Sequence, residues 1–114
     1  MALHYNLSKV YAISDNDVDF ARQIMVLFTE EVPPEIKNIR QGLKEKDYER
    51  VYHAAHKIKP TLDMLGMDLA YEDVLSIETW SRSEGKKKEI KEVYKSLKER
   101  LDHALKEIKK DYGL

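Results

Sequence analysis

Hydrophobic side chains recur every three or four residues along most of the chain, which is the spacing of one face of an α-helix. We expect Pro33 and Pro34 to break or sharply redirect the chain, because proline removes a helical hydrogen bond. Asp47 is the expected cap of the central helix, and Gly66 is expected to end it in a left-handed conformation. The helical segments predicted in this way cover residues 3–13, 18–33, 34–43, 47–65, 68–81 and 86–112.

Long amphipathic segments joined by short breaks predict an all-α fold. The expected architecture is an antiparallel up-and-down four-helix bundle, with the short N-terminal helix capping one end. The 114 residues suffice for one hydrophobic core but not for two, so we expect a single domain over residues 1–114. In the segment 68–81, we expect Leu69, Val74, Ile77 and Trp80 to point inward.

The helix over residues 47–65 has two distinct faces. At about 100° per residue, one stripe about 80° wide is wholly apolar. It consists of Val51, Ala55, Ile58, Leu62 and Leu65. The opposite strip carries Tyr52, His56, Lys59 and Asp63. We therefore expect His56 to point to solvent beside a lysine.

Composition narrows the classes of function. The chain has no cysteine, which excludes disulfides, thiolate metal sites and thiol catalysis. Its formal net charge of -1 gives no overall attraction to nucleic acid or to an anionic membrane, and we expect neither as a partner. No apolar run approaches about 18 residues and no signal peptide is evident, so a cytoplasmic location is expected. The four glycines are isolated, which makes an ATP-binding loop improbable.

An exposed His56 flanked by Lys57 and Lys59 suits phosphoryl transfer. Positive neighbours disfavour the imidazolium form, so we expect a neutral ring with a lone pair free to attack phosphorus. Lys59, one helical turn on, could offset the charge of the phosphoryl group, and Lys57 could assist it. The sequence therefore predicts a phosphoryl acceptor at His56, with the outer ring nitrogen, Nε2, as the reacting atom.

The surroundings of this histidine carry a family resemblance. The spacing His-x-x-Lys-(Gly)-x-x-x-x-aliphatic-Gly is reproduced by His56, Lys59 and Leu65-Gly66, with further similarity at Phe28 and at Ile77-Glu78. In these features the chain resembles histidine-containing phosphotransfer (HPt) domains. The resemblance implies a helical bundle that carries phosphate on His56 between receiver domains of response regulators and hybrid histidine kinases. It also implies that any Mg²⁺ belongs to the partner receiver, so that the chain has no cofactor of its own.

One position departs from the family pattern, because Pro60 stands where the family usually has glycine. Proline removes the helical donor to the His56 carbonyl, so we expect a kink beside the histidine. The greater bulk of Pro60 bears on how a partner approaches. We expect the docking surface to include Tyr52, Pro60, Asp63 and Gly66, and the carrier to be monomeric.

Two other functions remain open. One is a docking or structural bundle that binds a receiver or kinase without carrying phosphate. The other is a metal-binding bundle, suggested by Glu49, His53 and His56 and echoed by Glu99 and His103. Di-metal bundles place Glu-x-x-His pairs inward on two helices, whereas the spacing here is Glu-x-x-x-His on an outward face. The sequence therefore favours the phosphocarrier.

Overall fold

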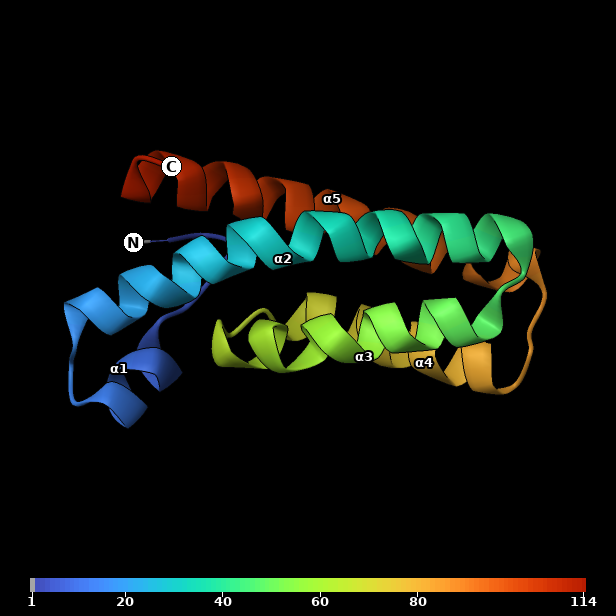
Figure 1. Ribbon diagram of the computed structural model, residues 1–114, viewed down its shortest axis with the longest axis horizontal. Coiled ribbons are helices and arrows are strands. Elements are labelled where there is room, and N and C mark those ends of the chain that lie inside the picture. The colour runs from blue at the N-terminus through green and yellow to red at the C-terminus, as the bar shows by residue number, and fades with distance from the viewer. Residues whose placement is uncertain (1) are drawn as a thin grey trace.

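The computed structural model describes residues 2–114, and every regular element within them is an α-helix (Figure 1). The helices are α1 (Ser8–Ser14), α2 (Val18–Glu45), α3 (Tyr48–Met64), α4 (Asp68–Arg82) and α5 (Lys87–Tyr112). The described part of the chain contains no strand. The predicted all-α fold with a short N-terminal helix is confirmed.

The four long helices pack side by side in a ring. α2 contacts α3, α3 contacts α4, α4 contacts α5, and α5 returns to α2, while α1 packs against α2 (Figure 1). The bundle measures 43 × 24 × 20 Å. Its core is built from one apolar face of each long helix, and its largest fully buried side chains include Phe28, Ile58, Leu62, Ile77 and Leu101. Burial of these faces is the main favourable term for the fold.

The expected break at Pro33 and Pro34 is wrong, because α2 runs without interruption from Val18 to Glu45. Both prolines lie inside the helix, between the buried residues Val32 and Ile36. Their missing N–H groups leave two carbonyls of the preceding turn without a helical donor. Packing of the apolar face on both sides of the prolines holds the helix together despite this loss.

The N-terminal helix is shorter than expected, because it begins at Ser8 rather than at residue 3. Residues 3–6, here called the N-terminal strap, instead hydrogen-bond to distant parts of the chain. The backbone N–H groups of Leu3 and His4 donate to the Glu107 carboxylate at 3.0 and 2.8 Å. The hydroxyl of Tyr5 donates to Asp111 at 2.7 Å. The strap therefore ties the N-terminal region to the C-terminal half of α5.

Sequence features at both ends fix the position of α3. At its start the Asp47 side chain accepts the N–H of Arg50 at 3.1 Å, which confirms the predicted cap. At its end Gly66 has φ +64°, which confirms the left-handed conformation. A Cβ at Gly66 would lie 2.8 Å from the Cβ of Asn6, so only glycine lets the strap pass this closely. The Asn6 N–H donates to the Leu65 carbonyl at 2.7 Å in the same place.

Candidate functional site

The facing of α3 places His56 on the surface of the bundle. The predicted inward stripe is buried throughout: Val51, Ala55, Ile58, Leu62 and Leu65 are all at most 2% exposed. The side chain of His56, on the other side of the helix, is 57% exposed. The predicted outward position of the imidazole is therefore confirmed, on a helix fixed by its buried face.

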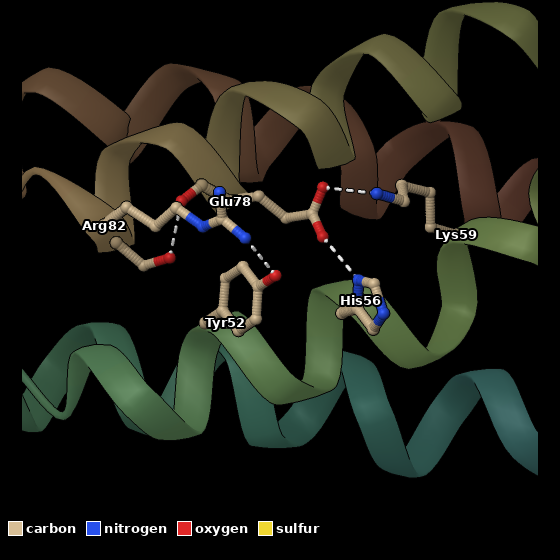
Figure 2. Close-up of polar contacts among 6 residues, drawn as sticks. Tyr52, His56, Lys59, Glu78 and Arg82 are labelled. Carbon is tan, nitrogen blue, oxygen red and sulfur yellow. Dashed lines mark hydrogen bonds and ion pairs between the residues drawn. The ribbon is translucent and has the colours of Figure 1, made fainter.

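A carboxylate from α4 organises the side chains around this histidine. Oε2 of Glu78 lies 3.0 Å from Nδ1 of His56, and its Oε1 accepts a hydrogen bond from Nζ of Lys59 at 2.9 Å. Figure 2 shows the Glu78 carboxylate between the two α3 side chains. The Glu78 side chain is only 9% exposed, so the carboxylate is held in the seam between the helices. One buried anion thus serves both His56 and Lys59.

This arrangement corrects the expected electrostatics of the ring. The sequence predicted that two lysines set the charge around His56, whereas the charged group that contacts the ring is a carboxylate. The hydrogen bond to Glu78 raises the pKa of Lys59, against the opposing effect of burial. Lys59 is therefore a cation at neutral pH. It is also more enclosed than predicted, with its side chain 23% exposed.

Tyr52 and Arg82 complete the surroundings of the ring. The Tyr52 ring lies one turn before His56 and stacks on it, with centroids 5.6 Å apart and planes 13° apart. The guanidinium of Arg82, from α4, lies 4.8 Å from the centroid of the Tyr52 ring and donates to its hydroxyl (Figure 2). Tyr52 therefore restricts one face of the imidazole, and Arg82 restricts Tyr52.

The other predicted site residues lie apart from the ring. Nζ of Lys57 lies 3.8 Å from Glu35, so this lysine is directed toward α2. Nζ of Lys9 donates to Asp63 at 2.7 Å, two turns or about 10 Å along α3 from His56. Pro60 is exposed inside α3 and does not end the helix. The structure thus brings Tyr52, His56 and Lys59 together and places Lys57, Asp63 and Gly66 outside this cluster.

Sequence reasoning assigned no role to Glu78 or Arg82, although a signal for Glu78 was present. Val74, Ile77 and Ser81 form the buried stripe of α4, and Glu78 occupies a position on the same stripe. A carboxylate on a buried stripe requires a partner, because an unpaired buried charge is costly. Arg82 follows Glu78 by four residues, but its contact with Tyr52 depends on how α3 and α4 pack.

The contact with Glu78 also determines which nitrogen of His56 can react. An ionised carboxylate can only accept hydrogen bonds, so Nδ1 is the nitrogen that carries the proton in the neutral ring. Nε2 is then left with a lone pair. The site can therefore act as a nitrogen nucleophile whose leading atom is Nε2.

Other classes of site find little support in the described residues. Nε2 of His53 lies 3.5 Å from Glu49, but His56 is directed toward Glu78 instead of joining this pair. Within residues 2–114, no group of three or more histidine or carboxylate side chains is arranged to hold a metal ion. No helix in the same range is long and apolar enough to span a bilayer.

Comparison with known proteins identifies a related family. A family model described as the Hpt domain matches residues 23–111, which include α3, α4 and nearly all of α5. No curated protein and no solved structure matches the chain at a significant level.

Proposed function

The chain belongs to the Hpt domain family, the histidine phosphotransfer domains of phosphorelays, and we propose that it carries the phosphoryl group on Nε2 of His56. It accepts this group from the aspartyl phosphate of one receiver domain and passes it to a second receiver. The observation that carries the proposal is the hydrogen bond between Nδ1 of His56 and the buried carboxylate of Glu78, which leaves Nε2 free on a side chain that is 57% exposed. The partners are the receiver domains of response regulators and hybrid histidine kinases.

The transfer step follows from this geometry. The Nε2 lone pair attacks phosphorus, the N–P bond forms, and the P–O bond to the aspartate breaks with its electrons remaining on the carboxylate. The imidazole gains positive charge as Nε2 bonds to phosphorus, while the proton stays on Nδ1. Glu78 faces that proton at 3.0 Å and stabilises the developing charge. Attack by the aspartate of the second receiver reverses these steps.

Tyr52 and Lys59 act as positioning residues in this proposal. Stacking by Tyr52 and the bond to Glu78 hold the ring in one orientation, so that little rotational freedom is lost when the receiver docks. Lys59 holds the other oxygen of Glu78 and supplies a cation near the phosphoryl group. Mg²⁺ is supplied by the partner receiver, and the chain contributes no ATP site.

The surface around His56 is proposed to dock the receiver. On α3, the half-buried Tyr52 lies one turn before His56, and the exposed Pro60 lies one turn after it. We propose that these two residues lie under the bound receiver. Asp63 and Gly66 lie two or more turns from His56 and would be reached only by the outer edge of a receiver.

The test compares two histidines on the same helix. Wild type, His56→Gln and His53→Gln are each incubated with a phosphorylated receiver domain and Mg²⁺, and acid-labile phosphate on the chain is measured. His53 is a matched control because it is also exposed, at 70%, and lies one turn before His56. We expect His56→Gln to remain unlabelled and His53→Gln to be labelled like wild type. Label retained on His56→Gln would refute the assignment, and a receiver that binds wild type without transferring phosphate would indicate a docking module.

A further inference from the structure

A pocket of about 290 Å³ lies between the C-terminal part of α2 and the N-terminal part of α5. Its floor is apolar and consists of Leu43, Ile90 and Tyr94. Leu43 and Ile90 are 9% and 4% exposed, so the floor is an edge of the hydrophobic core. Every other residue that lines the pocket is a cation, and these are Arg40, Lys44, Lys87, Lys88 and Lys91. We call these five residues the basic rim.

The basic rim has no acidic partner within the described chain. No carboxylate of residues 2–114 lies within 4.0 Å of any of its five charged groups, whereas Lys9, Lys59 and Lys98 elsewhere are each paired with one. Nζ of Lys87 donates to the Lys44 carbonyl at 2.6 Å, which joins the start of α5 to the end of α2. Because the chain has 20 basic and 21 acidic residues, this is a local concentration of positive charge on a nearly neutral molecule.

We propose that this pocket binds an acidic segment of a partner protein through one or two hydrophobic side chains. The apolar floor favours a hydrophobic group that displaces water, and the five unpaired cations favour carboxylates on either side of that group. The volume lies just below the range of about 300 to 1,000 Å³ for small-molecule pockets, which suits side-chain anchors. A hydrophobic anchor flanked by glutamate or aspartate satisfies both parts of the pocket.

The pocket lies on the opposite side of the bundle from His56. It is formed by α2 and α5, whereas His56 and Glu78 lie on α3 and α4, and Figure 1 shows these as two separate pairs. A receiver docked over His56 would leave the pocket uncovered. The acidic segment and a receiver can therefore bind at the same time, so that this surface could hold the carrier on a third protein during transfer.

The binding test uses the full chain and two synthetic peptides. One is a blocked peptide of two leucines flanked on each side by three glutamates, and the other has serines in place of the leucines. The floor residues belong to the core, so the peptide pair, and not a floor variant, tests the apolar contribution. Lys44→Glu/Lys91→Glu tests the basic rim, and Lys106→Glu/Lys109→Glu is its control of equal charge in the last turns of α5. Circular dichroism confirms that each variant is folded.

We expect saturable binding of the leucine peptide, with amide shifts in the NMR spectrum concentrated at residues 40–44 and 87–94. Affinity should fall about tenfold or more, equivalent to about 1.4 kcal/mol, for the serine peptide and for Lys44→Glu/Lys91→Glu. The control variant and His56→Gln should change it less than about twofold, and phosphoryl transfer by Lys44→Glu/Lys91→Glu should match wild type. Equal binding of both peptides, no saturable binding, or binding only to phosphatidylserine vesicles or dodecanoate would overturn the proposal.

Discussion

The carboxylate of Glu78 is shared by a histidine and a lysine, so a substitution that removes its charge affects both partners. In Glu78→Gln the amide oxygen can still accept a hydrogen bond from the Nδ1–H group, but the neutral amide no longer balances the charge that develops on the ring during transfer. We expect phosphorylation of His56 to slow about tenfold to a hundredfold, measured with one phosphorylated receiver under single-turnover conditions. Glu72→Gln, on the exposed side of α4, is the matched control and should react like wild type.

Lys59 has a structural partner that the sequence did not predict, so its removal should affect stability as well as transfer. Lys59→Ala leaves Oε1 of the buried Glu78 without its donor. We expect both a lower melting temperature and slower phosphorylation of His56. Lys57→Ala, whose partner Glu35 lies on the α2 side, should slow transfer less. An unchanged melting temperature for Lys59→Ala would show that the contact with Glu78 contributes little to folding.

Gly66 and Gly113 allow backbone strain to be separated from crowding. Both have positive φ, at +64° and +66°. A Cβ on Gly66 would lie 2.8 Å from Asn6, whereas a Cβ on Gly113 would have no neighbouring atom within 4 Å. We expect Gly66→Ala to lower the free energy of unfolding by more than the roughly 1–2 kcal/mol of left-handed strain. Gly113→Ala, near the end of α5, carries the strain without the crowding, so it should lower the free energy of unfolding by less than Gly66→Ala does. Equal losses in chemical denaturation would mean that contact with the strap does not constrain Gly66.

The site residues that could be predicted from the sequence are those that lie close to His56 along the same helix. His56, Lys59 and Tyr52 lie within two turns of one helix, so their spacing alone places them on one side of it. Glu78 lies 22 positions after His56, and only the packing of α4 on α3 brings it to 3.0 Å. For the same reason Lys57, adjacent to His56 in sequence, is directed toward another helix.

At the scale of the element, the facing of α3 and α4 can be tested with two leucines. Leu62 is fully buried, and Leu62→Ala should lower the free energy of unfolding by about 2–5 kcal/mol by opening a cavity. Leu69 was predicted to point inward but is 59% exposed in the first turn of α4. Leu69→Ala should therefore change the free energy of unfolding by less than about 0.5 kcal/mol in urea denaturation. Comparable losses at both positions would contradict this facing.

Helix boundaries can be predicted from the sequence where a nearby side chain caps the helix. They are missed where packing against other helices determines whether a helix continues. Asp17 and Asp47 cap α2 and α3 through their own side chains, and the cap at Asp47 was predicted. The rule that proline ends a helix failed at Pro33 and Pro34 because the buried residues Val32 and Ile36 anchor α2 on either side. Intrinsic preference is a weak guide where tertiary contacts of this kind oppose it.

Across the whole molecule, the strap links the N-terminal region to α5 through a group that titrates at acid pH. Burial would raise the pKa of Glu107, but the N–H groups of Leu3 and His4 and the charge of His4 lower it overall. Since the folded-state pKa is lowered, the stabilising effect is present above the ordinary glutamate pKa of about 4.3 and is lost as pH falls through the lowered value. We expect the amide signals of Leu3 and His4 to shift in that acid range.

Glu107→Gln provides the comparison for this titration. An amide at position 107 cannot ionise, so the Leu3 and His4 signals should lose the shift expected in the acid range of the lowered Glu107 pKa. A shift of equal size in Glu107→Gln would mean that another group, and not Glu107, controls the strap.

The order of the helices in the ring also has a consequence for folding kinetics. Three of the four packed pairs are neighbours in sequence, and only α2 with α5 joins segments separated by two other helices. Chains dominated by such local contacts fold in microseconds to milliseconds. Among these four helix pairs, α2 with α5 closes the longest loop, so this seam is the natural last step of bundle formation and the first to open. The basic rim spans that seam, and a bound acidic segment would therefore slow unfolding more than it would accelerate folding.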